Sequence, residues 1–229
     1  MPEVRVVKLV LFDCDGTLVD SQHVIVAAMT RAFARAELAL PPREAVLGIV
    51  GLSLVEAMRR LGDDDPHFPA ERLADLYREA FRELRTEPGF FEPLFPGVRG
   101  VLDKLSARED VLLGIATGKS QRGVAAVLGH HGLDGRFVTI QTADDAPSKP
   151  HPAMVLQAMA ATGVHAEDTV LIGDTSFDMV MARAAGARAI GVTWGYHPRE
   201  TLRQSGAERL VSDADTLVGV IDEMWEPVA

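Results

Sequence analysis

The stretch LVLFDCDGTLVDS, residues 9–21, decides how this chain folds. An apolar run ends at Asp13, a second acid follows at Asp15, and Gly16 comes directly after it. Residues 6–12 are mostly aliphatic and β-branched with little alternation, which is typical of a strand buried on both faces of a parallel sheet. A buried strand that ends in acids indicates either a polar turn or a catalytic site, and the rest of the chain decides between these interpretations.

Similar apolar runs recur along the chain and alternate with segments of helical spacing. Strands are predicted at 111–117, 137–144, 169–174 and 187–194, and helices at 97–107, 121–131, 152–162 and 176–185. This alternation predicts an α/β fold with a doubly wound, mostly parallel, Rossmann-like sheet. In such a sheet, ligands lie at the carboxyl ends of the strands, near the point where the strand order reverses.

Residues 21–93 break this alternation. They contain no strand pattern, and helices are predicted at 24–36, 42–49, 54–61 and 71–85. We therefore expect two structural units. One is an α/β core formed by residues 1–20 and 94–229, and the other is an all-helical insert of residues 21–93.

The composition is that of an ordinary packed globular protein, with 47% hydrophobic and 24% charged residues. A net charge of −10 argues against nucleic acid or an anionic membrane as a partner. We expect a small-molecule ligand and a chain that is a monomer or a homodimer. Cys14 is the single cysteine, which leaves no intramolecular disulfide and no cysteine metal cluster. The first apolar run is too short for a signal or membrane-spanning segment, which favours a cytoplasmic location.

Acidic side chains gather where the predicted strands end. The residues at the first four strand ends are Asp13, Thr117, Asp144 and Asp174. Because the carboxyl ends of parallel strands meet at one edge of the sheet, these side chains are expected to lie together there. Hydrophobic packing does not require acids at these positions, so their recurrence favours a catalytic site.

The first acidic pair suits phosphoryl transfer. The carboxylate of Asp13 could attack phosphorus and form an aspartyl-phosphate, which splits one difficult step into two. Asp15 could serve as general acid for the leaving oxygen and then as general base for the attacking water. Gly16 permits close approach of the backbone to a phosphate.

The segment GDTSFD, residues 173–178, supplies two further acids. Asp178 lies four residues after Asp174, so both face the same way if a helix begins at Thr175. Clustered carboxylates repel one another unless a cation is present, and oxygen ligands of this kind suit Mg²⁺. The alternative is that Asp174 or Thr175 only caps the helix.

Two further segments provide groups that bind anions. In ATGKS, residues 116–120, Thr117 ends a strand, and Gly118 with the following backbone N–H groups could form an anion cradle, although the spacing is not that of a P-loop. In SKPHP, residues 148–152, Lys149 could neutralise a phosphate and reduce the repulsion among the acids. A capped helix start and a solvated loop lysine are the alternatives.

The motifs DCDGTLVDS, Thr117, Lys149 and GDTSFD occur in the order found in the haloacid dehalogenase superfamily, which this chain resembles over its whole length. The insert resembles the small cap of that superfamily. Residues 191–202 and 206–211 resemble the tail of phosphoglycolate phosphatase-like members, although many of those have asparagine where this chain has Gly118. The resemblance implies that Thr117 and Lys149 bind a transferring phosphoryl group.

The resemblance also assigns roles to the acids. It implies that Asp13 is the nucleophile and a metal ligand. Asp15 would be the acid/base and would offer its backbone carbonyl to Mg²⁺. Asp174 would ligate the metal, and Asp178 would ligate or orient it. The implied activity is a Mg²⁺-dependent phosphatase for a small phosphate monoester such as phosphoglycolate, with pyrophosphate, nucleotides or sugar phosphates as alternative substrates.

Other activities of the superfamily fit the chain less well. Its dehalogenases lack the second acid of the first motif, which is Asp15 here. Phosphonoacetaldehyde hydrolases use a cap lysine, and residues 21–96 contain no lysine. β-Phosphoglucomutases have a histidine ten residues past the second acid, where this chain has Ile25, so a sugar-phosphate mutase is less favoured. A non-catalytic binding protein on the same fold would be expected to lack Asp13 or Asp15.

The insert is expected to select the substrate. Its loop at residues 49–53 should face the site. Arg43, Arg59 or Arg60 could bind a carboxylate of the substrate, because a guanidinium group can hold a carboxylate through two hydrogen bonds.

The insert is also expected to open and close. Linkers near residues 19–21 and 92–97 would act as hinges, and closure would exclude water from the reaction. Asp20 and Ser21 are expected to mark where the chain leaves the core and to take no part in the chemistry.

Overall fold

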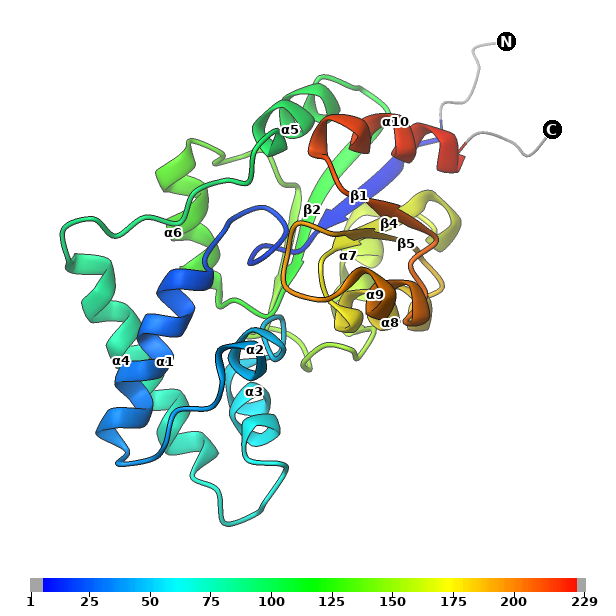
Figure 1. The fold of residues 1–229 in the computed structure, drawn as a ribbon. Coiled ribbons are helices and arrows are strands. Elements are labelled where there is room, and N and C mark those ends of the chain that lie inside the picture. The colour runs from blue at the N-terminus through cyan, green and yellow to red at the C-terminus, as the bar shows by residue number, and fades with distance from the viewer. Residues whose placement is uncertain (1–5, 226–229) are drawn as a thin grey trace, which may run out of the picture.

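A six-stranded sheet forms the centre of the computed structural model, which describes residues 6–225 (Figure 1). The strands lie in the order β3-β2-β1-β4-β5-β6, and every pairing is parallel. Their bounds are β1 Lys8–Phe12, β2 Val111–Thr117, β3 Thr139–Thr142, β4 Thr169–Gly173, β5 Arg188–Val192 and β6 Arg209–Val211. The predicted doubly wound α/β fold is confirmed. The ends of the predicted core, residues 1–5 and 226–229, lie outside the described residues.

The first strand is buried on both faces, as its apolar run predicts. Leu9 and Leu11 pack into one hydrophobic cluster, whereas Val10 and Phe12 pack into another, because successive side chains of a strand point to opposite faces. The cluster around Phe12 is covered by α5 (Val98–Ser106), α6 (Gln121–His131) and α10 (Ala214–Trp225). The other cluster is covered by α7 (Ala153–Thr162), α8 (Ser176–Ala184) and α9 (Arg199–Gln204).

The last part of the chain contains elements that the sequence patterns do not predict. These are β6, α9 and α10. β6 has three residues, pairs only with β5 and exposes Arg209, so no buried apolar run marks it. β3 is also an edge strand, and it is shorter than the predicted 137–144 because only Thr139–Thr142 pair with β2.

Four helices follow β1 in the segment 21–93, which we call the helical insert. They are α1 (Gln22–Arg35), α2 (Arg43–Leu47), α3 (Leu54–Leu61) and α4 (Ala70–Thr86). They surround a hydrophobic cluster of their own that includes Phe33, Met58 and Leu73. Figure 1 shows these helices beside the end of the sheet toward which β1 runs. Within residues 6–225, none of the helices combines the length and apolar character needed to cross a membrane.

The two segments that join the insert to the core run side by side. Val19 forms a bridge with Leu94. The N–H of Asp20 donates to the Pro93 carbonyl oxygen at 2.8 Å. The N–H of Phe95 donates to the carbonyl oxygen of Leu18 at 3.0 Å. The two expected hinge segments are thus neighbours in space.

Candidate active site

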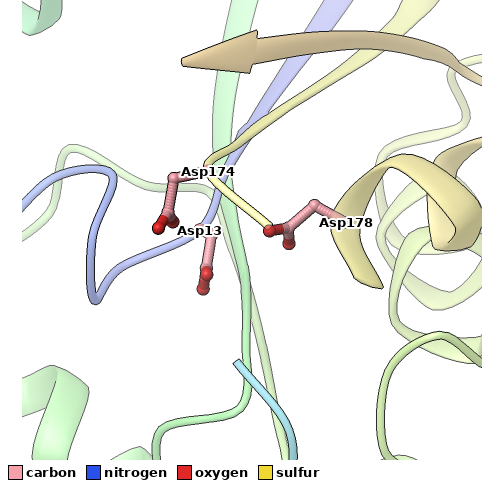
Figure 2. Close-up of side chains that lie close together, drawn as sticks. All are labelled: Asp13, Asp174 and Asp178. Atoms are coloured by element: carbon pink, nitrogen blue, oxygen red, sulfur yellow. The ribbon is translucent and has the colours of Figure 1, made fainter. Parts of the chain in front are cut away.

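Three aspartates converge at the carboxyl end of the sheet (Figure 2). Asp13 directly follows β1, Asp174 directly follows β4, and Asp178 lies in the first turn of α8. All three are fully buried, and one carboxylate oxygen of each lies within 4.8 Å of the other two. β1 and β4 are neighbours at the point where the strand order reverses, which is where open α/β sheets bind ligands.

Lys149 lies among these acids. Its Nζ is 2.9 Å from Asp13 Oδ1 and 2.6 Å from Asp178 Oδ1. Burial alone would lower the pKa of Lys149, but the two carboxylates raise it, so the amine stays charged. Burial raises the pKa of Asp13 from 3.8 to about 6, opposed by Lys149 and assisted by Asp178. Burial and the neighbouring acids also raise the pKa of Asp174 well above its ordinary value. One lysine therefore does not compensate three buried carboxylates.

One carboxylate oxygen of this cluster has no partner. Asp13 Oδ2 is buried and accepts no hydrogen bond from any residue within 6–225. The two oxygens of Asp174 are oriented by the hydroxyl of Thr17 at 2.9 Å and by the N–H of Tyr196 at 2.8 Å. Buried carboxylate oxygens with uncompensated negative charge are the donor set that Mg²⁺ prefers. The residues present therefore fit this ion.

Asp178 also caps helix α8. The N–H and the hydroxyl of Thr175 donate to Asp178 Oδ2 at 3.1 and 2.6 Å, and the N–H of Asp178 donates to Thr175 Oγ1 at 3.3 Å. These bonds form a capping box. The capping interpretation and the site interpretation are compatible, because Asp178 uses Oδ2 for the cap and Oδ1 for Lys149.

Asp15 is held by residues that the sequence patterns do not indicate. Its Oδ1 accepts hydrogen bonds from the hydroxyl of Ser21 at 2.6 Å and from Lys119 Nζ at 2.8 Å. Lys119 Nζ also lies 3.0 Å from Glu92 Oε1, and these two side chains are only 9% and 5% exposed. Burial alone would lower the pKa of Lys119, but Asp15 and Glu92 raise it well above its ordinary value. Lys119 therefore stays charged and holds Asp15 in a partly buried ion pair.

The prediction that Ser21 only marks the exit from the core needs correction, because its hydroxyl binds Asp15. Asp20 instead accepts hydrogen bonds from Gln22. Lys119 lies in ATGKS, the segment in which only Thr117, Gly118 and the following backbone N–H groups are predicted to bind an anion. A signal was available, since Lys119 is one of only four lysines and follows a predicted strand end.

Gly16 and Gly118 occupy positions where a side chain would collide. Gly16 has a φ of +86°, and a Cβ there would lie 2.2 Å from Asp174 Oδ2. The close approach that this glycine permits is therefore to a carboxylate of the site. A Cβ on Gly118 would lie 2.3 Å from the carbonyl oxygen of Gly51. Loop 49–53 of the insert thus directly contacts the backbone at Gly118.

A cavity of about 600 Å³ lies between the insert and the core. Asp13, Asp15 and Thr117 contribute to its lining from the core, together with Gly118. Loop 49–53 contributes from the insert, as predicted. The cavity therefore connects the acidic site to the segment expected to select the substrate.

The predicted arginines do not line this cavity. Arg43 and Arg59 are exposed, and each donates to another side chain of the insert at 2.7 Å. Helix α3 turns Met58 into the hydrophobic cluster, which leaves Arg59 and Arg60 on its outer face. The arginines that line the cavity are Arg78, Arg82 and Arg85 of α4 and Arg122 of α6.

Known proteins are similar to this chain over most of its length. Residues 10–192 match the family model described as haloacid dehalogenase-like hydrolase. A probable phosphatase, IndB, of Dickeya dadantii is 36% identical over 92% of both chains. A phosphoglycolate phosphatase of Pseudomonas putida is 31% identical over 92% of this chain and 78% of the relative. The crystal structure of a hydrolase from Pseudomonas syringae has a TM-score of 0.82 and 28% identity, and the match covers 94% of this chain and 98% of that one.

Proposed function

Because the chain belongs to the haloacid dehalogenase-like hydrolase family, we propose that it is a Mg²⁺-dependent phosphatase that forms an aspartyl-phosphate on Asp13. The observation that carries this proposal is the buried, unpartnered Oδ2 of Asp13 among Lys149, Asp174 and Asp178. The proposed substrate is a small-molecule phosphate monoester such as phosphoglycolate, the compound in the names of several relatives. Pyrophosphate, nucleotides and sugar phosphates are the alternative substrates.

In the first step, Asp13 attacks phosphorus. A bond forms between its carboxylate oxygen and phosphorus while the bond between phosphorus and the ester oxygen breaks. Asp15 gives a proton to the departing oxygen. Thr117 and Lys149 hold the transferring phosphoryl group, and the charge of Lys149 stabilises the negative charge on its oxygens.

In the second step, water cleaves the aspartyl-phosphate. Asp15, now ionised, takes a proton from the water, whose oxygen bonds to phosphorus as the bond to Asp13 breaks. Inorganic phosphate leaves, and both carboxyl groups return to their starting protonation states. Ser21 and Lys119 position Asp15 in both steps, since they bind its Oδ1.

The acidic cluster supplies the metal ligands of the proposal. Asp13, Asp174 and the backbone carbonyl of Asp15 would hold Mg²⁺, and Asp178 would ligate or orient it. When bound, the ion offsets the negative charge of the carboxylates and of the phosphoryl oxygens. The hydrogen bond from Thr17 keeps Asp174 oriented toward the cluster.

Ile25 supports hydrolysis over a sugar-phosphate mutase. It lines the cavity at the position where β-phosphoglucomutases carry a histidine, and an isoleucine cannot move a proton. The full burial of Asp13 supports a small molecule, in place of a nucleic acid or a membrane, as the partner. For the chain itself we propose a monomer or a homodimer.

We further propose that residues 21–93 are a cap domain that closes over a core of residues 1–20 and 94–229. Polar contacts between the two include the N–H of Ser53 donating to Ser148 Oγ at 2.8 Å. His197 Nε2 also lies 3.2 Å from a carbonyl oxygen of the insert. A hydrogen bond of this kind contributes about 1 kcal/mol, so these contacts would not prevent opening for substrate entry.

Replacing Gly118 with alanine is expected to hinder closure of the cap. The added Cβ would meet the carbonyl oxygen of Gly51 at 2.3 Å, so loop 49–53 would have to move away. We expect kcat/KM to fall about 10- to 100-fold, because a displacement of about 1 Å near the reacting groups has effects of this size. Gly100→Ala, which adds a Cβ in open space on α5, is the matched control. If the Gly118→Ala enzyme keeps the kcat/KM of the wild type, close contact between loop 49–53 and Gly118 is not required for activity.

Phosphate release from a panel of esters tests the proposed function. The panel contains phosphoglycolate, pyrophosphate, nucleoside monophosphates, sugar phosphates and p-nitrophenyl phosphate, each assayed with Mg²⁺ and with EDTA. We expect release with Mg²⁺, loss of release with EDTA, and recovery when Mg²⁺ is restored. A protein that releases no phosphate from any member of the panel would instead be a non-catalytic binding protein on this fold.

A further inference from the structure

We propose that Arg82, Arg85 and Arg122 form a binding site for a second anionic group of the substrate, a carboxylate or a phosphate carried by the leaving group. The inference rests on the proposed phosphatase function, since it places the ester phosphate at Asp13. It names the substrate class as extended phosphate monoesters with a distal anion.

Helix α4 presents a row of arginines to the cavity. Arg78, Arg82 and Arg85 are separated by four and three residues, which places them on one face of the helix, and all three line the cavity that Asp13 also lines. An α-helix rises about 10 Å over seven residues, so the row is longer than a two-carbon ester. Arg122, in the first turn of α6, lines the same cavity from the core.

Three of these guanidinium groups lack acidic partners. Within residues 6–225, no carboxylate oxygen lies within 4.0 Å of Arg82, Arg85 or Arg122, whereas Arg78 pairs with an aspartate at 2.7 Å. The Nε of Arg85 is buried without a hydrogen-bond partner in the described chain, and its guanidinium lies 5.5 Å from the ring centroid of Phe81. Buried donors are paired in most folded proteins, so this one indicates an acceptor supplied by a ligand.

The acids that line the cavity do not neutralise the arginines. Asp13 pairs with Lys149, and Asp15 pairs with Lys119. Asp144 accepts a backbone N–H at the start of α6 at 2.9 Å. The cavity therefore has an acidic part that suits a cation and a basic part that suits an anion. In a chain with a net charge of −10, the basic part would concentrate anionic ligands locally.

The remaining lining fits a leaving group with an apolar body. Ile25, Met29, Leu52 and Phe81 all contribute to the cavity. Its volume of about 600 Å³ is in the range of pockets that enclose drug-sized ligands. Phosphoglycolate would leave most of this volume to water. The lining thus favours a longer molecule whose ester phosphate reaches Asp13 while its distal anion reaches α4.

The test uses three six-carbon esters that share one leaving-group chemistry. Hexyl phosphate has a neutral tail, 6-phosphooxyhexanoate has a carboxylate tail, and hexane-1,6-diyl bisphosphate has a phosphate tail. We expect the wild type to favour the two anionic tails in kcat/KM by about 10- to 100-fold, the range for charge-assisted hydrogen bonds. Arg82→Gln and Arg122→Gln should each lower this ratio of kcat/KM values about tenfold. Arg60→Gln, an exposed arginine of α3 away from the cavity, is the matched control.

Binding of non-hydrolysable phosphonates separates this inference from the phosphatase proposal. Calorimetry in Mg²⁺ buffer would compare 6-phosphonohexanoate with hexylphosphonate, and it needs no turnover. The anion site is supported if the wild type binds 6-phosphonohexanoate more tightly than hexylphosphonate and if Arg82→Gln weakens that binding. This result would support the site even if no ester is hydrolysed. Equal binding of the two phosphonates by the wild type overturns it. A preference for phosphoglycolate over the two six-carbon esters with anionic tails also overturns it, if neither substitution changes that preference.

Discussion

Asp13→Asn protein is expected to lose turnover by at least about 10⁴-fold in kcat, as enzymes do when their nucleophile is removed. An amide carries no negative charge to attack phosphorus and cannot form the aspartyl-phosphate. The substitution also removes one acidic partner of Lys149. Phosphate release under single-turnover and multiple-turnover conditions measures the loss. Asp20→Asn is the matched control, because Asp20 bonds to Gln22 and lies outside the acidic cluster.

The same variant is expected to keep its fold. Asp13 has a pKa of about 6 in the folded chain against an ordinary value of 3.8. The folded state therefore binds a proton on Asp13 more tightly than the unfolded state does. The stability of the metal-free wild type consequently falls as the pH rises from 3.8 through about 6. Asparagine does not titrate, so without metal the variant should gain stability relative to the wild type between about pH 5 and about pH 7.5. Thermal unfolding in EDTA at these two pH values checks the sign.

Two results would remove Asp13 as the nucleophile. One is a folded Asp13→Asn protein that retains turnover close to that of the wild type. The other is wild-type activity that resists both beryllium fluoride and aluminium fluoride, which mimic a phosphoryl group on a carboxylate. A drop in turnover that accompanies loss of the folded state would be assigned to stability, and the unfolding curves distinguish the two cases.

Lys119→Met is expected to slow esters with poor leaving groups about 10²-fold or more, within the range for a positioned general acid. Lys119 and Ser21 are the groups that hold Asp15 Oδ1, and methionine keeps the apolar length of lysine without its charge. An alkyl ester requires a proton on its leaving oxygen, whereas p-nitrophenolate leaves without one. We therefore expect hydrolysis of p-nitrophenyl phosphate to fall much less than hydrolysis of an alkyl phosphate.

The dependence on the leaving group separates positioning of Asp15 from general damage to the site. A structural effect on the nucleophile or on the phosphoryl site would slow both esters equally, and equal losses would contradict the role given to Lys119. Glu92→Gln is the matched control, because it removes the second partner of Lys119 and leaves the bond to Asp15 in place. Its effect on the alkyl ester should be smaller than that of Lys119→Met.

Several features of this protein are determined by the sequence alone. An apolar run with little alternation is typical of a strand buried in a parallel sheet, and acids directly after such a strand lie at the carboxyl edge of that sheet. The sequence therefore predicts Asp13 and Asp174 at the same edge of the sheet, whereas the pairing of β1 with β4, which makes the two acids neighbours, is a feature of the tertiary structure. The spacing of four residues likewise brought Asp178 to the same side, because a helix returns to the same face after one turn.

Other features were decided only by the tertiary structure. Lys119 reaches Asp15 across a long stretch of sequence, and Glu92 joins them from the returning linker. Arg82 and Arg85 line the cavity, whereas Arg43 and the other predicted arginines do not, and this difference depends on how α4 lies against the core. An arginine on an amphipathic helix has the same local pattern whether it faces a cavity or bulk water. The sequence therefore predicted the catalytic edge from local rules. The contribution of the helical insert to the cavity depends on how the insert packs against the sheet, and no local periodicity encodes that.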